Sequence, residues 1–133
     1  MPITHHDPTS HQLEWENHDR TQSLSIAPPD IETAAWLAAH SHEWACWLNV
    51  SGTGFGLTAE HTQRLNQLVH AVGEPEQTHT IPAAPPTDDL TLTITTSPQG
   101  LDLHVTGPNA DGQSDIPATD TPTIAHLLDQ LTQ

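Results

Sequence analysis

Strict alternation of apolar and polar residues over positions 90–105 constrains the fold of this chain more than any other feature. Apolar side chains take every second position on both sides of a Ser-Pro-Gln-Gly turn at 97–100. Residues two apart in a strand point to the same face, so each run has one apolar and one polar face. The apolar positions are Leu90, Leu92, Ile94, Leu101, Leu103 and Val105. The pattern predicts an antiparallel hairpin with one face in a core.

Three more stretches have the pattern of strands. Residues 11–17 place Leu13 and Trp15 on one face, and residues 21–27 follow after a short polar turn, so we expect a second hairpin. Residues 43–51 alternate as well, which places Trp44 on the face of Cys46 and Trp47 on the opposite, less covered face. These stretches supply the remaining strands of the expected sheet.

Helix-start residues precede three segments with helical periodicity or composition. The predicted helices cover 31–40, 59–72 and the last turns of the chain from Pro122 onward. Their expected N-caps are Asp30, Thr58 and Thr121. Ile31, Ala34, Ala35 and Ala38 share one side of the first helix. That side is expected to meet the sheet.

These elements predict an α+β fold in the order ββαβαββα, with a small antiparallel sheet of about five strands and helices on one face. The chain of 133 residues has the size of a single domain, 1–133. We found no internal repeat. Apolar residues are sparse over 1–10, 73–89 and 107–121, so we expect a mobile tail followed by two long loops rich in acidic residues or Pro.

The charge balance excludes several function classes. Seventeen carboxylates face two basic residues, Arg20 and Arg64, so the formal net charge is −15. Proteins that bind nucleic acid directly depend on Lys and Arg to neutralise phosphates, and we therefore exclude such binding. The acidity is compatible with a merely solvated surface or a saline habitat. Fifteen uncompensated charges nevertheless exceed what solubility requires.

The stretch VSGTGFGLT, residues 50–58, lies between a predicted strand and a predicted helix. Gly52, Gly54 and Gly56 take the first, third and fifth positions, whereas a dinucleotide fingerprint needs the first, third and sixth. A phosphate-binding Walker loop needs a Lys, and the chain has none. We interpret the stretch as a flexible connection in which glycines supply positive φ.

No catalytic signature, cofactor motif or metal motif stands out. Cys46 is the single cysteine, which excludes an internal disulfide and a CxxC motif, and its strand position predicts a core residue. His40 and His42 are metal-ligand types, but a third ligand such as His61 or His104 would have to come from elsewhere. With no apolar run of membrane length and no signal peptide, we expect a cytoplasmic protein without a membrane partner.

The carboxylates carry the functional hypothesis. Glu14 and Glu16 project from one strand face at roughly 7 Å, similar to the spacing of phosphates along a nucleic-acid strand. Ordered carboxylates of this kind attract proteins with basic nucleic-acid-binding surfaces. We therefore expect an inhibitory DNA mimic, such as a phage-encoded anti-CRISPR or anti-restriction protein. The predicted partner-binding residues are Glu14, Glu16, Trp47, Glu74, Glu76, Asp88, Asp89, Asp111, Asp115 and Asp120, with Trp47 as the aromatic anchor.

Two alternatives belong to other function classes. An immunity protein or antitoxin would neutralise a basic toxin, often a nuclease, without imitating nucleic-acid geometry. A His-based metal-binding domain would be stabilised by zinc and destabilised by EDTA. The sequence predicts neither the partner's identity nor the oligomeric state.

Overall fold

The computed structural model describes residues 3–7, 11–85, 87 and 89–132. Within these residues, nine strands form two antiparallel sheets and three helices accompany them. The α+β class is thus confirmed. The prediction of a single sheet of about five strands is wrong, because two of the regions expected as loops contain strands and the strands form two sheets.

The N-terminal sheet holds five strands in sequential order. These strands are β1 (Ile3–Asp7), β2 (Gln12–Glu16), β3 (Ser23–Ala27), β4 (Cys46–Val50) and β5 (Thr53–Leu57). The predicted hairpin of 11–17 with 21–27 is confirmed as β2 and β3. Residues 3–7, expected in a tail, pair with β2. The other residues of that tail, 1–2 and 8–10, lie outside the described part.

The C-terminal sheet holds β6 (Gln77–Pro82), β7 (Thr91–Ser97), β8 (Gly100–Gly107) and β9 (Ala110–Pro117), again in sequential order. The predicted hairpin of 90–105 is confirmed as β7 and β8. The prediction of long loops over 73–89 and 107–121 is wrong, since these ranges contain β6 and β9. The inward residues of β9 include Gly112 and Ser114, so this strand lacks the apolar alternation by which strands are recognised.

Three helices begin close to their predicted starts. They are α1 (Ile31–Ala39), α2 (Ala59–His70) and α3 (Thr121–Leu131). The Asp30 side chain accepts a hydrogen bond from the Thr33 amide, and the Thr58 side chain accepts one from the His61 amide, as their positions predicted. The cap of α3 is Asp120, one residue earlier than expected. Among the described residues, no helix has the length and apolarity needed to cross a membrane.

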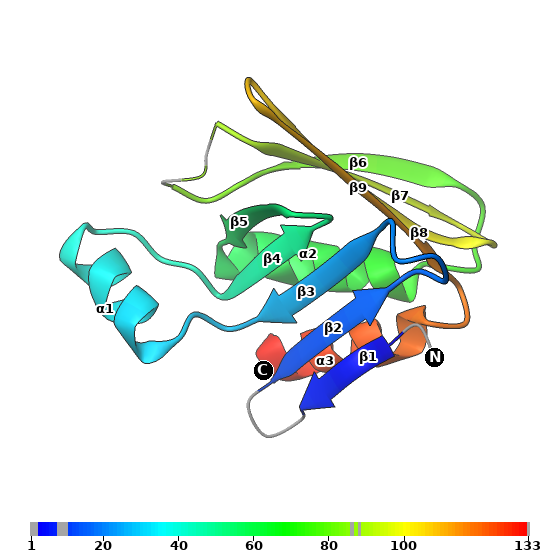
Figure 1. Cartoon of the computed structure of the whole chain (residues 1–133), viewed down its shortest axis with the longest axis horizontal. Helices are drawn as coiled ribbons and strands as arrows, with labels where there is room; N and C mark the ends of the chain where they lie inside the picture. Colours follow the sequence, from blue (N-terminus) through cyan, green and yellow to red (C-terminus); the bar gives the residue numbers. More distant parts are fainter. Residues whose placement is uncertain (1–2, 8–10, 86, 88, 133) are drawn as a thin grey trace.

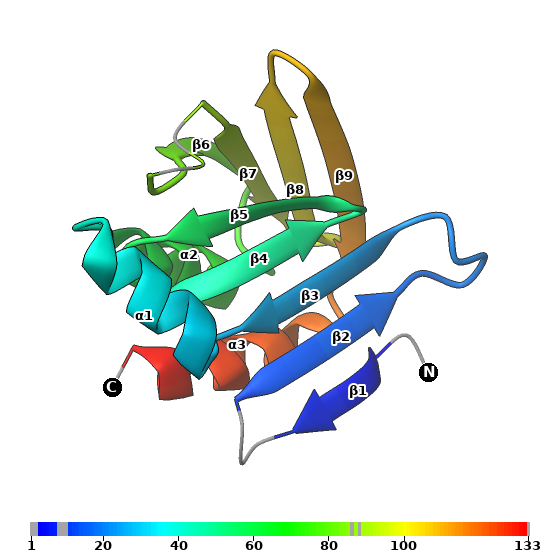
Figure 2. The same cartoon turned by 60° about the vertical axis from the view of Figure 1, so that its left-hand side comes forward.

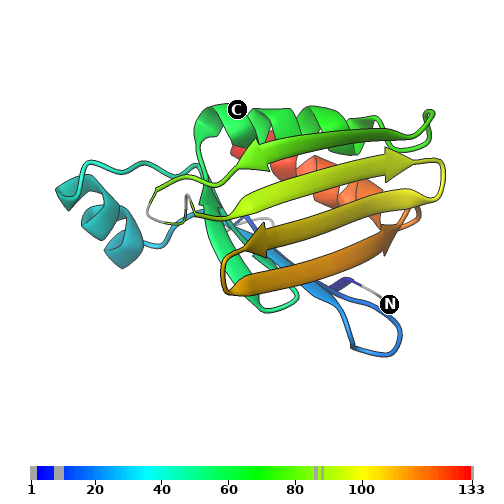
Figure 3. The same cartoon turned by 90° about the horizontal axis from the view of Figure 1, so that it is seen from above.

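The two sheets meet at an angle and enclose α2 and α3 between their inner faces (Figures 1 and 3). At the junction, β9 lies against β4 and β5. The Ser114 hydroxyl donates to the Ser23 carbonyl oxygen over 2.6 Å, and the Ser51 hydroxyl donates to the Gln113 carbonyl oxygen, also over 2.6 Å. A Cβ at Gly112 would overlap the Val50 carbonyl oxygen, so glycine is what permits this approach. One apolar core fills the enclosed space.

The two halves of the chain share one plan. Strands β2 to β5 followed by α2, and strands β6 to β9 followed by α3, each form a sequential antiparallel sheet with a helix after it. The halves differ in their second connection. Residues 28–45, which include α1, join β3 to β4, whereas two residues, Pro98 and Gln99, join β7 to β8. Helix α1 is therefore an addition to the shared plan.

Candidate partner-binding surface

The glycine-rich stretch 50–58 forms a hairpin and not a strand-to-helix loop. Val50 pairs with Thr53, and between them Ser51 and Gly52 have φ of 49° and 94°. Such a two-residue turn with two positive φ angles matches the twist of the strands that it joins. The expected flexible connection is thus wrong, because residues 53–57 are β5. The sequence of 53–57 was not recognised as a strand because glycines occupy both of its outward positions, Gly54 and Gly56.

The glycines of β5 make room for two tryptophans. The rings of Trp44 and Trp47 stack with centroids 5.0 Å apart and planes at 26°. A Cβ at Gly54 would overlap the Trp47 ring, and a Cβ at Gly56 would overlap the Trp44 ring. Both rings therefore lie flat across β5. Trp44 was expected on the face of Cys46, but it precedes β4 and its Nε1 donates to the Pro85 carbonyl oxygen over 2.8 Å.

Trp47 alternates with the buried residues of β4, and both rings lie on the glycines of β5, so they occupy the outer face of the N-terminal sheet. Figure 2 shows α2 and α3 behind the other face of this sheet. Cross-strand pairing places Ala27, Trp47 and Gly56 in one row. Ser25, Asn49 and Gly54 form the next row, which continues to the carboxylate of Glu14 on β2. We call this surface the tryptophan face. Its residues are Glu14, Glu16, Ser25, Ala27, Trp44, Trp47, Asn49, Gly54 and Gly56.

Glu14 and Glu16 lie on this face as predicted, two residues apart on β2. At the rise of a strand, their side chains are roughly 7 Å apart. Arg20, in the turn that follows, lies with its Nε 3.6 Å from a carboxylate oxygen of Glu16. Both members of this ion pair are well exposed, so it contributes little to stability. The acidic and aromatic parts of the tryptophan face are joined by small side chains.

The other predicted partner-binding carboxylates are spread over the molecule. Glu74 and Glu76 are exposed between α2 and β6, and Asp89 is exposed just before β7. Asp111 and Asp115 are exposed on the outer face of the C-terminal sheet, which is a separate face of the molecule from the tryptophan face (Figures 2 and 3). Asp88 lies outside the described residues. The structure does not bring these groups onto one surface.

Asp120 is not a surface carboxylate. It is 9% exposed and accepts a hydrogen bond of 3.0 Å from the indole Nε1 of Trp15, which is 1% exposed. The sequence predicted an exposed carboxylate at Asp120, and the structure buries it instead. The group satisfies a buried donor and fixes the start of α3 against β2.

Sequence reasoning missed Asp102. On the outer face of the C-terminal sheet it lies directly across from Asp115. Partial burial, followed by the nearby Asp115 carboxyl, raises the pKa of Asp102 to about 6, although Gln113 donates a hydrogen bond to it over 3.0 Å. The pair could not be predicted because β9 was not recognised as a strand.

Cys46 and His40, considered as a nucleophile and a metal ligand, both have partners within the fold. Cys46 is buried, its sulfur lies 3.4 Å from the Thr62 hydroxyl, and desolvation raises its pKa to about 11. His40 stacks on Trp36 at 4.2 Å and donates to the Trp36 carbonyl oxygen over 2.8 Å. In the described part of the chain, no group of three or more His, Cys, Asp or Glu residues is arranged to hold a metal ion.

No family model, no curated protein and no solved structure matches this chain. The surface of the chain itself is therefore the basis for its function.

That surface includes a second feature that the sequence analysis misplaced, the apolar side of α1. The residues expected to meet the sheet are exposed, and Leu37 is the buried one. Ile31 is 89% exposed and Trp36 is 47% exposed. The available signal was the lack of any charged residue in α1 after Glu32, which leaves the helix without a polar side.

Proposed function

We propose that this chain is a small inhibitory binding protein that engages a cationic protein partner through the tryptophan face. One observation carries the proposal. Two stacked tryptophans lie flat on the outside of a sheet, over glycines that have no side chain to block the rings. Carboxylates lie on the same face. Tryptophan is enriched among the residues that dominate binding energy at protein interfaces.

Charge supports a cationic partner over other kinds. Arg20 lies against Glu16, and Arg64 lies 3.2 Å from a ring nitrogen of His79 on β6, away from the tryptophan face. A net charge of −15 attracts basic surfaces and speeds their association, and it repels phosphate-rich ligands. These charges favour a protein with a basic binding surface.

The distribution of carboxylates favours neutralisation of a basic toxin or nuclease, the activity of an immunity protein or antitoxin. A long phosphate-like array would need many carboxylates on one surface, but the predicted ones within the described residues do not gather on one surface. Imitation of DNA is the second candidate, favoured by the spacing of Glu14 and Glu16. A phage-encoded inhibitor of restriction or CRISPR nucleases is the specific form of that candidate.

Two charge-matched double variants test the proposed surface. Glu14→Gln with Glu16→Gln removes two charges from the tryptophan face, and Asp111→Asn with Asp115→Asn removes two from the C-terminal sheet. Partners captured from a cell lysate at low salt should be basic proteins. We expect the first pair to weaken this capture about tenfold and the second to change it less than about twofold. Equal losses in both would contradict the proposed surface.

Competition decides between the two candidates. The captured partner is challenged with short DNA and RNA duplexes while bound to the chain. Displacement of the chain by either nucleic acid would establish mimicry, since a mimic and its model share one site. Simultaneous binding would establish neutralisation at a separate surface.

A further inference from the structure

Helix α1 is weakly held by its own fold. A helix that packs on a core buries one stripe of side chains. In α1 that stripe is reduced to Leu37, while Ile31 and Trp36 are exposed. The helix projects beyond the ends of both sheets (Figure 3). Since the shared plan of the two halves does not include α1, its apolar surface is not explained by the fold.

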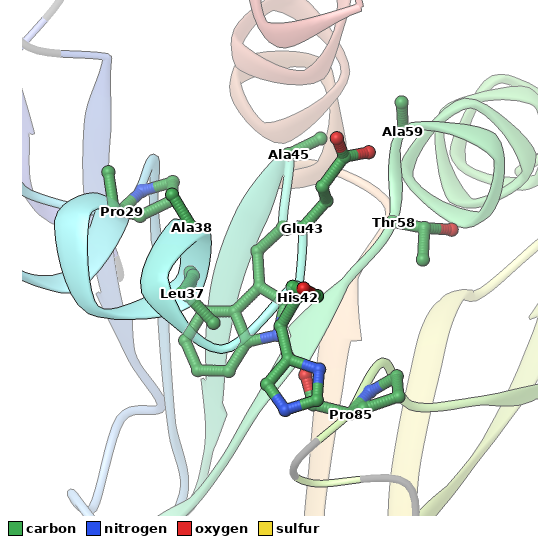
Figure 4. A pocket seen from close by; sticks show the side chains of 12 residues that line it. Pro29, Leu37, Ala38, His42, Glu43, Ala45, Thr58, Ala59 and Pro85 are labelled. Carbon is green, nitrogen blue, oxygen red and sulfur yellow. The ribbon is translucent and has the colours of Figure 1, made fainter.

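A groove runs between α1 and the start of α2, along the side of α1 that carries Ala34, Leu37 and Ala38 and not the exposed Ile31 and Trp36. Its volume is about 770 Å³. Leu37 and Ala38 form one wall, Ala59 belongs to the opposite wall, and Glu43 lies between them (Figure 4). Trp44 also lines the groove and stacks on Trp47, so the groove continues onto the tryptophan face. The nine residues of α1 span about 13 Å, enough to lie beside two to three turns of another helix.

The charges around the groove select its occupant. Glu43 is exposed on the lining beside His42, and Asp30 and Glu32 lie outside the lining at the start of α1. Neither arginine of the chain lines the groove. A second copy of this chain would bring another −15 charges against these carboxylates, so self-association is disfavoured. Cationic side chains next to an apolar stripe match both properties of the groove.

We infer that this groove binds an amphipathic helical segment of the cationic partner. The segment's apolar stripe lies between α1 and Trp44, and its Lys or Arg side chains face Glu43. Amphipathic helices are commonly recognised by apolar grooves through side chains spaced three and four residues apart. The inference rests on the proposed function, and it adds the site and the chemistry of the segment that enters it.

Synthetic peptides serve as probes. The first carries Leu in a helical stripe with Lys elsewhere, the second has the same composition in scrambled order, and the third replaces Lys by Glu. Isothermal titration calorimetry should show the first peptide binding at least about tenfold more tightly than either of the others. Equal binding of the first two peptides would show charge attraction without a groove and would overturn the inference.

Neighbouring alanines of α1 provide a matched control. Ala38 lines the groove, whereas Ala39 is exposed on the same helix outside the lining. We expect Ala38→Trp to fill the groove and weaken the first peptide about tenfold, and Ala39→Trp to change it less than about twofold. Ala59→Trp repeats the block from the opposite wall, on a different helix.

The outcomes separate the inference from the proposed function. Unchanged peptide affinity in both blocking variants, or sedimentation as a dimer that these variants dissociate, would overturn the groove inference. The capture experiment with the Glu14 and Glu16 variants is independent of those results. If the wild type captured no basic protein in that experiment, the proposed cationic partner would be contradicted whatever the peptides did.

Discussion

At the residue scale, the buried contact between Trp15 and Asp120 shows how an acidic residue can be mistaken for a binding group. In the sequence, Asp120 stands in a polar stretch among other carboxylates. In the structure Asp120, at the start of α3, accepts a hydrogen bond from the indole of Trp15 on β2. The two residues are 105 positions apart in the sequence. Only the packing of α3 on β2 brings the two together, so no local pattern could predict it.

Asp120→Ala should destabilise the protein by about 1–3 kcal/mol, because it leaves the buried indole N–H without an acceptor. Asp120→Asn keeps an oxygen acceptor and should cost less. Urea unfolding followed by circular dichroism measures both free energies. Equal stability of the Ala variant and the wild type would show that this hydrogen bond contributes nothing to stability.

Asp102 makes stability depend on pH in the direction opposite to most carboxylates. Its pKa rises from 3.8 in the unfolded chain to about 6 in the fold. The folded state therefore holds the proton more tightly, and this contribution to stability is fully present below about pH 3.8 and lost as pH rises through about 6. Because Asp102 is only partly buried, screening reduces the effect to the order of 1 kcal/mol.

Asp102→Asn should accordingly raise the melting temperature at pH near 7.5 by about 3 °C. At pH near 4 the difference should vanish, since the wild-type carboxyl is then protonated as well. Asp89→Asn, at an exposed position before β7, is the control and should change little at either pH. A gain from Asp102→Asn that persists at pH 4 would contradict the raised pKa.

At the element scale, strands could be predicted wherever apolar side chains mark the inward positions. Strands β7 and β8 were predicted on their Leu, Ile and Val alternation. Strand β9 was missed because its inward positions include Gly112 and Ser114. Gly112 lies against the Val50 carbonyl oxygen of β4, and Ser114 donates to the Ser23 carbonyl oxygen of β3. Strand β5 resembled a loop because Gly54 and Gly56 point outward beneath the tryptophans. Close packing between distant segments explains these small residues, and a single stretch of sequence does not show it.

Gly54→Ala tests the packing of β5 against Trp47. The added methyl group overlaps the ring and should destabilise the fold by about 1–3 kcal/mol. In a Trp47→Ala background the ring is absent, so the same substitution should cost markedly less. Thermal unfolding of the two single variants and the double variant gives the coupling energy. A coupling of zero would show that Trp47 does not lie on Gly54.

In the candidate site, too, the sequence predicted what a single strand determines and missed what depends on contacts between separate elements. Strand periodicity alone assigned Glu14, Glu16 and Trp47 to outward positions of their own strands, and the pairing of β2 with β3 and of β3 with β4 joins them on one face. Trp44, Asp102 and the exposure of α1 depend on how separate elements meet. Helix α1 shows this most clearly, since its composition suited a core helix and the structure leaves it projecting from the body.

At the scale of the whole molecule, uncompensated acidity should control association with the partner. Salt screens exposed charges, so the association rate should fall about tenfold as ionic strength rises from roughly 50 to 300 mM. Stopped-flow fluorescence with the captured partner measures this rate. A rate indifferent to salt would contradict electrostatic steering.

Acidification should slow association as well. Protonation of all 11 histidines would change the net charge from −15 to −4. As a residue type, histidine gains its charge near pH 6.5, which lies within the interval from about pH 7.5 to 5.5. Asp102, with a pKa of about 6, loses its charge in the same interval. The stopped-flow rate should therefore fall across this range, and a constant rate would show that the total charge is irrelevant.

Chemical-shift mapping by NMR tests the central claim most directly. Unlabelled captured partner is added to the labelled chain, and backbone amide shifts are followed through both sheets. We predict that the largest changes fall on the outer positions of β2 to β5 and on residues 28–45, with the C-terminal sheet nearly unaffected. Changes concentrated on Asp102, Asp111 and Asp115 would place the partner on the C-terminal sheet and contradict the account.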